Sequence, residues 1–321
     1  MVATKSKTGT LSRVMSGSGG VAIFLVVLFV ALSVAAPNFL TVSNLVNVVD
    51  QVTVLGILAV GGTMVIITGG IDLSVGSVVG LGSMTMGFLS HQAGLPMWVA
   101  MLAALAAGAA GGLVNGLGVT LANLPPFIAT LAMMSVARGI ANLITNGQQI
   151  VGYPEWFDNL SMMRYMNFLS ITTVVLIITY VIGWIVLRYR RAGRSIYAIG
   201  GGAEVARLAG INVRRVTIGV YTCAGALAAL GGIILATRLD SSVPSAGTGY
   251  ELNVIAAVVI GGASLSGGIG RISGTVVGVL IMGLLSNGLN LLGISPFIQS
   301  IIIGLIIGLA VMTDTLRHHN A

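Results

Sequence analysis

The stretch RYRRAGRSIYAIGGGAEVARLAGINVRR, residues 188–215, decides how the rest of the chain is interpreted. It holds seven of the chain's 15 basic residues, and long apolar tracts lie on both sides of it. A charged side chain at the centre of a bilayer costs about 2.5–3.5 kcal/mol on insertion scales, so this stretch must lie in water. Because positively charged loops are retained on the cytoplasmic side, we expect it to be a cytoplasmic loop.

A short helix is predicted inside this loop, over residues 202–210, GAEVARLAG. Glycine flanks the segment on both sides, and its interior consists of residues that favour helix. A small helix on a cytosolic loop between two hydrophobic halves favours a functional element. The alternative is a solvated loop whose arginines only fix the orientation of the chain.

The composition places the chain in a membrane. Of its 321 residues 56% are hydrophobic and 7% are charged, whereas soluble domains carry about 25% charged residues. The net charge of +7 does not predict nucleic-acid binding, because the basic residues lie in loops and tails without interleaved aromatic residues. The single Cys223 excludes an internal disulfide and a pair of cysteine metal ligands, and we expect it to pack inside a span.

Apolar tracts with room for spans of about 20 residues predict an all-α polytopic membrane protein with about ten transmembrane helices. The expected spans are 20–36, 52–68, 73–90, 97–120, 127–146, 168–187, 216–237, 251–262, 272–292 and 297–315. The first tract follows Lys5, Lys7 and Arg13 and resembles a signal peptide. Because no clear cleavage site follows it, we interpret it as a retained first helix.

The positions of the charges agree with this number of crossings. From a cytoplasmic tail, residues 1–19, six crossings return the chain to the cytoplasm at Arg188, as the basic loop requires. Four more leave a second tail, residues 316–321, on the same side of the membrane domain, residues 20–315. By the same count two loops lie outside: 147–167 and 238–250.

Two apolar tracts are interrupted by the same glycine-rich motif. Residues 69–76 read GGIDLSVG and residues 261–268 read GGASLSGG, so both fit GG-x-x-LS-x-G. The repetition predicts an internal duplication, and transporters built from two repeats often place broken helices at a shared pathway. The alternative is that both are ordinary turns between spans. The candidate pathway or gate residues in these motifs are Gly70, Asp72, Ser74, Gly262, Ser264 and Ser266.

Small residues also recur every four positions on single helix faces, which lets helix backbones approach closely in lipid. Three such stripes are present: Ala104, Gly108, Gly112 and Gly116; Gly270, Gly274 and Gly278; and Ser300, Gly304 and Gly308. We expect most of them to pack within the protomer and leave open whether one serves a contact between protomers.

Motifs for catalysis, metal binding and nucleotide binding are missing from the sequence, so we expect no catalytic residue, metal site or cofactor. No G-x-x-x-x-G-K-[ST] occurs, and no histidine has a cysteine or carboxylate at metal-ligand spacing. Asp72 is the only carboxylate that we find embedded in an apolar tract, which gives little support to a proton-coupled carrier. Capping of a helix that begins at Leu73 explains it equally well.

Neutral amide side chains recur near the ends of the expected spans, Asn287 and Asn290 among them. Hydrogen-bonding groups without a fixed charge suit a neutral, hydroxyl-rich solute, so we include both in the candidate pathway. Hydrogen bonds between neighbouring helices are the alternative.

Several longer stretches resemble the membrane subunit of a bacterial ABC importer of the sugar type, most of all ribose permeases. They are GGIDLSVGSVVGLGSM (69–84), PPFIATLAMMSVARGI (125–140), GRSIYAIGGGAEVARLAGINV (193–213), PSAGTGYELNVIAAVVIGGASLSGGIGRISGT (244–275) and NGLNLLGI (287–294). Together they extend over nearly the whole chain from Pro37 onward. Permeases for xylose, galactose and autoinducer-2 share much of them, so the motifs identify the family better than the sugar.

The resemblance implies that residues 202–210 are a coupling helix that docks in a groove of a partner ATPase. The residues assigned to this contact are Gly202, Ala203, Glu204, Ala206, Arg207 and Gly210. Glu204 and Gly210 match the family's E-A-A…G pattern, and Val205 stands where that pattern has a small residue. The family further implies a second permease copy, ATP sites on cytoplasmic subunits and a periplasmic sugar-binding protein.

The outer loops are the expected docking site for that binding protein. Glu155 and Asp158 give the first loop a negative character, and Arg238 with Asp240 forms a pair of opposite charges in the second. Three aromatic residues of the first loop are either anchors of this contact or a belt at the bilayer interface: Tyr153, Trp156 and Phe157.

We therefore expect a permease of the bacterial inner membrane, surrounded by lipid, that imports a small neutral sugar, with ribose as the first candidate. An ion-coupled secondary carrier is one alternative, and an ABC permease for another monosaccharide or for autoinducer-2 is another. An intramembrane enzyme lacks a catalytic pair in this sequence. The soluble binding protein usually sets the specificity in this family, so the sequence does not identify the sugar.

Overall fold

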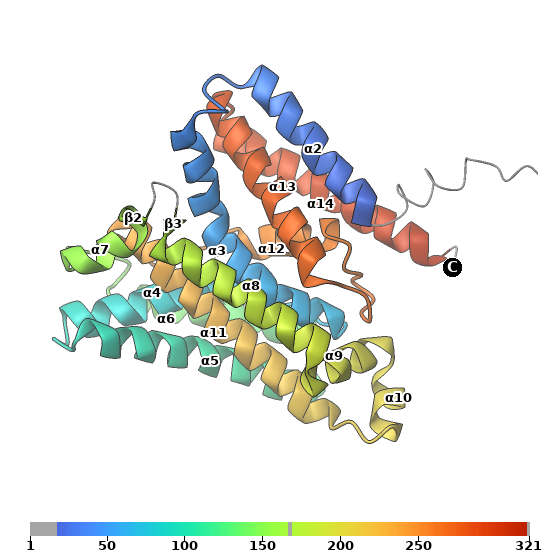
Figure 1. The fold of residues 1–321 in the computed structure, drawn as a ribbon. Coiled ribbons are helices and arrows are strands. Elements are labelled where there is room, and N and C mark those ends of the chain that lie inside the picture. Colours follow the sequence, from blue (N-terminus) through green and yellow to red (C-terminus); the bar gives the residue numbers. More distant parts are fainter. Residues whose placement is uncertain (1–17, 166–168, 320–321) are drawn as a thin grey trace, which may run out of the picture.

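Helices make up most of residues 18–165 and 169–319, the part of the chain that the computed structural model describes (Figure 1). In chain order they are α2 (Ser18–Ala35), α3 (Val42–Ile67), α4 (Val75–His91), α5 (Met97–Thr120), α6 (Pro126–Leu143), α7 (Glu155–Met162), α8 (Ile171–Tyr189), α9 (Arg191–Gly201), α10 (Ala203–Leu208), α11 (Val213–Leu239), α12 (Tyr250–Ile260), α13 (Ile272–Leu291) and α14 (Pro296–His319). The predicted helical fold is confirmed for these residues. The first 17 residues of the predicted N-terminal tail lie outside them.

Two pairs of short antiparallel strands close the loops at one end of the bundle. β1 (Ile150–Val151) pairs with β4 (Ser241–Ser242). β2 (Arg164–Tyr165) pairs with β3 (Leu169–Ser170). β1 and β4 come from the two loops that are expected to lie outside, so these loops contact each other. We call this end of the molecule, which also carries α7, the strand end.

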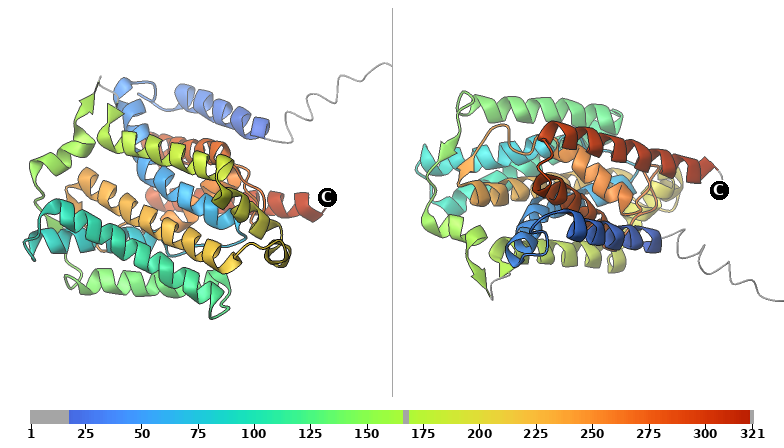
Figure 2. Two further views of the ribbon diagram at one scale, coloured as in Figure 1. Left: turned by 60° about the horizontal axis from the view of Figure 1, so that its bottom comes forward. Right: turned by 90° about the horizontal axis from the view of Figure 1, so that it is seen from above.

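Helices α9 and α10 lie at the opposite end of the bundle, which we call the basic end (Figure 1 and Figure 2). The first turn of α2 and the last turns of α14 lie at the same end in both views. The basic loop and the two ends of the described chain therefore share one side of the molecule. The charge pattern of the sequence predicts this arrangement.

The expected spans coincide with helices, and α5 has the predicted bounds. Helix α3 begins well before its predicted start at residue 52, because Thr41 Oγ1 accepts a hydrogen bond from the Asn44 amide and caps the helix at Thr41. Helix α12 has only 11 residues, about 16 Å at 1.5 Å per residue, and is too short to cross a bilayer alone. Helices α7 and α9 are additional to the predicted elements.

Six helices of the described chain are long and apolar enough to cross a membrane by themselves: α3, α5, α6, α8, α11 and α13. Helices α2 and α14 contain shorter apolar stretches, Gly19–Ala35 and Pro296–Leu309. These helices establish a polytopic membrane protein. The number of ten crossings stays a prediction.

Helix α4 lies inside the bundle, where it packs against α5, α6 and α11. Most of its 17 residues are buried. A Cβ atom at Gly82 would lie 2.8 Å from the Cα atom of Ala229 on α11, so the two backbones approach closely. Because α4 touches protein on most of its surface, it can carry polar residues such as Ser77 and Ser83.

The glycine stripe of α5 packs against α11, as expected for a contact within the protomer. A Cβ atom at Gly108 would collide with the Gly225 carbonyl oxygen. One at Gly116 would lie 2.7 Å from the Cα atom of Ile218. Small residues on α5 therefore allow main-chain contact with α11 along the stripe.

The other two stripes differ from each other. Gly278 of α13 packs against Ala257 of α12, where a Cβ atom would collide with the Ala257 carbonyl oxygen. A Cβ atom at Gly304 or Gly308 of α14 would meet no atom of the described chain within 4 Å. Within the described chain, only the first two stripes serve packing.

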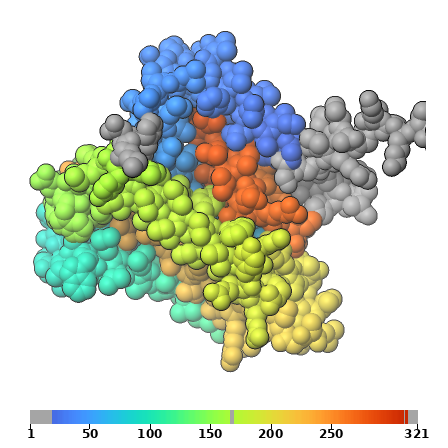
Figure 3. Space-filling view, viewed as in Figure 1, coloured from blue at the N-terminus to red at the C-terminus, as the bar shows by residue number. Residues whose placement is uncertain are grey.

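Helix α2, the first turns of α3 and α13 form a layer on one side of the bundle (Figure 3). The rings of Phe29 in α2 and Phe39 in the following loop pack edge to face, with their centroids 5.4 Å apart. Phe39 is almost completely buried. This aromatic contact fixes the turn between the first two helices.

Candidate functional site

The predicted short helix is present as α10. It begins directly after Gly202, and it ends before Gly210, whose φ of +81° is left-handed and favours glycine. The Gly210 amide donates to the Arg207 carbonyl oxygen at 3.0 Å and satisfies one of the last carbonyl groups. The sequence predicted both ends of this helix correctly.

One side of α10 is exposed and partly apolar. The Val205 and Leu208 side chains are 72% and 83% exposed. Beside them the Arg207 guanidinium and the Glu204 carboxylate form an ion pair at 2.8 Å. Ala206 is buried on the other side. Two exposed apolar side chains next to a charged pair have the composition of a protein-contact surface.

Helix α9 attaches α10 to the bundle. Its Ile196 and Ile199 side chains are buried. Near its end, Gly200 touches main chain from two other segments, because a Cβ atom there would collide with the Ile67 carbonyl oxygen and the Gly268 amide nitrogen. The basic loop is therefore in direct contact with the end of α3 and with the loop before α13.

The two glycine-rich interruptions meet at this same point. The Gly268 amide donates to the Ile67 carbonyl oxygen at 2.9 Å. A Cβ atom at Gly267 would lie 2.9 Å from the Gly69 nitrogen and 3.0 Å from the Gly200 oxygen. We call this contact of three main chains, at Gly69, Gly200, Gly267 and Gly268, the glycine junction. Side chains larger than hydrogen would separate the segments.

Polar side chains hold the first interruption inside the bundle. The Asp72 Oδ1 atom accepts the Ser74 amide at 2.9 Å and the Ser74 hydroxyl at 2.6 Å. The Asn115 side-chain amide of α5 donates to Ser74 Oγ at 2.9 Å. Helix α4 begins at Val75, so Asp72 forms a turn with Ser74 and does not cap a helix at Leu73 as expected.

Gly70 occupies a tight position within the first interruption. A Cβ atom there would collide with the Tyr221 hydroxyl of α11 and lie 3.2 Å from a Val65 methyl group. Tyr221 is almost completely buried. Nearby, the Thr130 hydroxyl of α6 donates to the Ile71 carbonyl oxygen at 3.2 Å.

The second interruption is more exposed than the first. Gly262 has a φ of +91°, and a Cβ atom there would meet no atom of the described chain within 4 Å. Gly262 therefore does not mark a close approach like that of Gly70, and its backbone conformation is what favours glycine. Ser264 is buried, whereas Ser266 is exposed and its amide donates to Ser264 Oγ at 3.2 Å.

Asn287 and Asn290 join helices. Asn287 of α13 exchanges two hydrogen bonds with Asn44 of α3, at 3.0 and 2.9 Å. The Asn290 side-chain oxygen accepts the Gln299 side-chain amide of α14 at 2.7 Å. These bonds agree with the packing alternative, and a place of either residue in a pathway stays a prediction.

Two ionisable residues within expected spans carry interactions that the sequence interpretation missed. Arg138 of α6 donates to the Pro244 and Ala246 carbonyl oxygens, the latter at 3.0 Å. Glu251 of α12 accepts the Gly249 amide at 3.2 Å and interacts electrostatically with Arg138. An arginine within an apolar tract is costly unless it is partnered, so the presence of Arg138 in a span could have predicted these interactions.

The charges at the strand end differ from the expected docking rim. In the part of the chain that the structure describes, Arg238 and Asp240 form no ion pair. Asp240 lies beside Asp158 instead, and burial together with the Asp240 carboxylate raises the pKa of Asp158. A place of Arg238 and Asp240 in a docking rim stays a prediction. Glu155 is exposed at the start of α7, as a docking residue requires.

The aromatic residues of this loop also differ from expectation. Phe157 is fully buried and Tyr153 is 8% exposed. The Tyr153 hydroxyl lies 2.5 Å from the Ser242 hydroxyl of β4. Trp156 is 50% exposed. Of these three residues, only Trp156 can therefore serve as an anchor for a partner or as part of an aromatic belt.

Known proteins match the chain along most of its length. Residues 44–311 match the family described as branched-chain amino acid transport system / permease component. The chain is 47% identical to the ribose import permease of Escherichia coli (strain K12), over 91% of this chain and 92% of that protein. It is 43% identical to the ribose import permease of Bacillus subtilis (strain 168), over 90% of each chain.

A relative for another sugar is also similar. The galactose/methyl galactoside import permease of Haemophilus influenzae (strain ATCC 51907 / DSM 11121 / KW20 / Rd) is 36% identical, over 88% of this chain and 89% of that protein. No solved structure matches the chain significantly. The resemblance to sugar-importer permeases is confirmed. Because the family and its relatives match both the membrane helices and the basic loop, the chain belongs to this family of permease components of membrane transport systems.

Proposed function

We propose that this chain is the transmembrane subunit of an ATP-driven importer that moves a small neutral sugar, ribose in the first place, across the bacterial inner membrane. The observation that carries the proposal is the exposed apolar pair of α10, Val205 and Leu208, at the basic end. Contact with a cytoplasmic ATPase would bury these two exposed apolar side chains. The similarity to ribose import permeases supports the choice of sugar.

The role of the chain in this importer is to transmit movement, with ATP hydrolysed by partner subunits. Helix α10 is connected through α9 to the glycine junction, where Gly200 touches the end of α3 at Ile67 and the second interruption at Gly268. A displacement of α10 on ATP binding would therefore move the second interruption relative to the first. Rocking of the two repeats against each other would then open the pathway to alternate sides.

The orientation that this function requires has both termini and the basic end in the cytoplasm. Ten crossings follow if the enclosed α4 and the short α12 count together with α2, α14 and the six long helices. The tails, residues 1–19 and 316–321, are then cytoplasmic, and residues 20–315 form the membrane domain. The arginines of the basic loop support this orientation.

Cysteine labelling tests the orientation. After replacement of Cys223, which is exposed on α11, Ser195→Cys should resist an impermeant thiol reagent in intact cells and react after permeabilisation. Met162→Cys, at a side chain 62% exposed at the strand end, should react in intact cells. Labelling of the Ser195→Cys variant from outside would contradict the orientation.

A periplasmic binding protein is proposed to dock at the strand end, and a second permease copy to complete the membrane unit. Exposed Glu155 and Trp156 support the docking site. Glu155→Lys should weaken stimulation of ATP hydrolysis by the binding protein at low salt, where surface charges act most strongly. Asp158→Lys is a less specific test because Asp158 faces Asp240. Unchanged stimulation in the Glu155→Lys variant would remove this docking site.

Reconstituted transport tests the function itself. Vesicles that contain this chain, its ATPase and its binding protein should accumulate ribose when ATP is supplied on the side of the basic end. Accumulation should persist when an uncoupler removes the proton gradient. Uptake that needs an ion gradient and ignores ATP would instead show a secondary carrier, and ATP-driven uptake of another sugar would correct only the substrate.

The ATPase contact has its own test. Val205→Asp with Leu208→Asp should abolish association of the ATPase in a pull-down, because two buried charges would replace two apolar contacts. Glu204→Arg should weaken association less, since Glu204 is fully solvated beside Arg207. Leu239→Asp, at an apolar side chain of the strand end that is 53% exposed, is the control and should retain association. Full association of the Val205/Leu208 variant would show that α10 is not the contact.

A further inference from the structure

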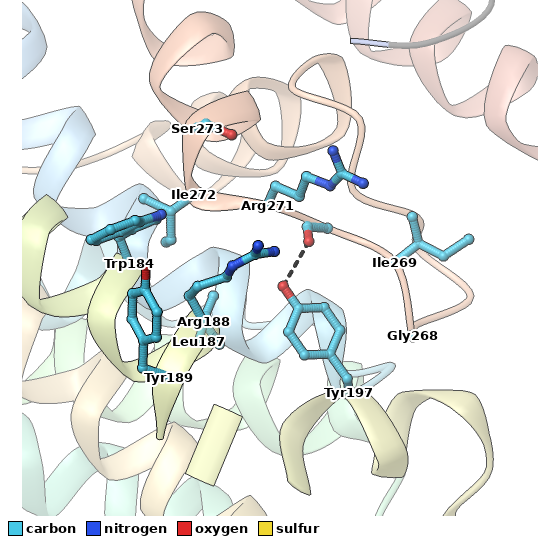
Figure 4. Close-up of a pocket in the computed structure, with 11 residues that line it drawn as sticks. Trp184, Leu187, Arg188, Tyr189, Tyr197, Gly268, Ile269, Arg271, Ile272 and Ser273 are labelled. Atoms are coloured by element: carbon cyan, nitrogen blue, oxygen red, sulfur yellow. Dashed lines mark hydrogen bonds between the residues drawn. The ribbon is translucent and has the colours of Figure 1, made fainter. Parts of the chain in front are cut away.

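A pocket of about 670 Å³ lies at the basic end, between the end of α8, α9 and the loop before α13 (Figure 4). The Tyr197 hydroxyl of α9 donates to the Gly270 carbonyl oxygen at 2.8 Å and connects two of its walls. Gly268 of the glycine junction also lines it. The volume is in the range of pockets that bind small ligands.

Two arginines from different elements line this pocket: Arg188 of α8 and Arg271, which precedes α13. Figure 4 shows the Arg188 side chain extending toward the Tyr197–Gly270 hydrogen bond, with Arg271 on the neighbouring wall. Both act on the Tyr197 hydroxyl: burial raises the pKa of Tyr197, and the charges of Arg271 and Arg188 oppose that rise. The two positive charges therefore lie close to one point.

This pair of positive charges has no counter-charge among the described residues. Neither Arg188 nor Arg271 forms an ion pair there, and the lining residues include no acidic side chain. Retention of a loop in the cytoplasm does not require such convergence, since Arg190 and Arg191 on the same loop already provide charge. Two guanidinium groups that share a pocket favour an anion with several oxygen atoms, such as a phosphate group.

An apolar face of α8 leads to the same pocket. Exposed side chains follow one another at helical spacing and end at Arg188: Val174, Ile177, Val181 and Trp184. Helix α8 is long and apolar enough to cross the membrane, so this face can touch lipid. Trp184 packs edge to face against Tyr189, with the ring centroids 5.1 Å apart. Tryptophan and tyrosine prefer the level of the lipid headgroups, which places the arginines at the depth of the phosphates.

We propose that this pocket binds the phosphate group of an anionic phospholipid of the cytoplasmic leaflet, with its acyl chains along the apolar face of α8. Arg188 and Arg271 contact the phosphate oxygens from two sides. Phosphatidylglycerol has the required chemistry, a single negative charge attached to two apolar chains. The inference rests on the cytoplasmic orientation of the basic end given under the proposed function.

A lipid in this position would stabilise the arrangement of α8, α9 and α13. It bridges the end of α8 to the loop before α13, and that loop carries both the Tyr197 contact and the glycine junction. Bound lipid would therefore resist separation of these three segments. Removal of the lipid should lower the thermal stability of the purified permease.

Thermal melting of the purified chain in neutral detergent tests the proposal. Dihexanoyl phosphatidylglycerol should raise the melting temperature at concentrations where dihexanoyl phosphatidylcholine and glycerol 3-phosphate do not. Arg188→Gln with Arg271→Gln should weaken this binding roughly 30-fold, from about a fivefold contribution of each basic side chain near a lipid surface. Arg190→Gln with Arg191→Gln removes the same charge outside the pocket and should retain binding.

Other outcomes would overturn the proposal. Equal weakening in the two double variants would show that general charge, not the pocket, attracts the lipid. Equal stabilisation by glycerol 3-phosphate would show a soluble phosphate ligand. Loss of ATPase association by the Arg188/Arg271 variant with unchanged lipid binding would assign both arginines to the ATPase contact.

Two features keep the test independent of folding and of transport. If the Arg188/Arg271 variant does not fold, Ser273→Glu adds a negative charge at the exposed edge of the same pocket and should also abolish the effect of phosphatidylglycerol. Stabilisation of the Ser273→Glu variant equal to that of the unchanged chain would contradict the proposal. No sugar transport is measured, so a wrong sugar in the proposed function would leave this result unaffected.

Discussion

The two interruptions, residues 69–76 and 261–268, share the motif GG-x-x-LS-x-G and have different surroundings. The first is enclosed by α5, α6 and α11, with Ser74 hydrogen-bonded on both of its sides. In the second, no described atom lies near Gly262 on the side where a Cβ atom would be. It continues into the loop that lines the pocket of Arg188 and Arg271. They touch each other at the glycine junction, where Gly267 meets Gly69.

The comparison shows that one motif can produce similar turns with different mechanical roles. The polar bonds of the first interruption fix it to the interior helices, so it resembles a rigid support. The second has main-chain contacts with α9 at Gly200, with α3 at Ile67 and with α13 at Gly274, and Tyr197 of α9 binds the loop that follows it. We expect the second interruption to follow α9 when α10 moves, and the first to stay with the bundle.

The largest difference between the two interruptions should appear when a bulky residue replaces the equivalent glycines, Gly70 and Gly262. Gly70→Leu should lower the yield of folded protein, because the added side chain collides with the hydroxyl of the buried Tyr221, and overpacking costs about 1–3 kcal/mol or more. Gly262→Leu should still assemble, because only the left-handed φ opposes it, at about 1–2 kcal/mol. Yield of monodisperse protein and ribose uptake measure both. Equal loss in the two variants would show that the interruptions have equivalent surroundings.

The glycine junction should be the next most sensitive point. Gly200→Ala places a methyl group against the Ile67 carbonyl and the Gly268 amide and should reduce ribose uptake by about tenfold or more. Gly201→Ala is the matched control, because a Cβ atom there meets no atom of the described chain within 4 Å. Both measurements use equal amounts of inserted protein. Similar uptake in the two variants would mean that the junction does not transmit movement.

The equivalent serines should differ by a smaller amount. Ser74→Ala removes the hydroxyl that bonds to Asp72 and Asn115, which leaves buried polar groups unpaired and should cost about 1–3 kcal/mol. Ser266→Ala changes an exposed side chain and should stay within about 0.5 kcal/mol. Thermal melting in detergent measures both. A larger loss for Ser266→Ala would reverse the assignment of rigid and moving interruption.

The smallest effects should come from removing the hydroxyl groups by which a neighbouring helix binds each loop. Thr130→Val removes the bond to the Ile71 carbonyl in the first interruption, and Tyr197→Phe removes the bond to the Gly270 carbonyl beside the second. Each should lower stability by about 0.5–1.5 kcal/mol. We expect only Tyr197→Phe to alter uptake, since only its loop contacts α9. An equal change in uptake for both variants would argue against this difference.

Much of the fold could be predicted because the signals are local. Apolar tracts predicted the helices, and the glycines around α10 predicted its ends. The enclosed position of α4 could not be predicted, because hydropathy does not distinguish lipid from protein neighbours. The contact between β1 and β4 depends on residues far apart in the chain, which local patterns do not report.

The candidate site was predicted less completely. The glycine motif identified two segments that are in contact. Because the motif is the same in both, the sequence did not show that Gly70 and Gly262 have different surroundings. The sequence showed Arg238 and Asp240 as opposite charges of one loop, whereas in space Asp240 lies beside Asp158 of the other loop. Spacing along the chain is a weak guide wherever a tight turn redirects a side chain, as at Asp240, whose φ is +47°.

The enclosed position of α4 has a consequence for biosynthesis. A major partner of α4 is α11, and the ribosome must complete all of the chain from His91 to Val213 before α11 begins to emerge. At about 5–20 residues per second this delay is on the order of ten seconds. Throughout that time the serine- and glycine-rich segment lacks the protein wall that it needs. Helix α4 must therefore remain in the translocon, or be shielded by an insertase, until α11 is made. Shortening this delay should raise the yield of folded protein more than stabilising the finished bundle.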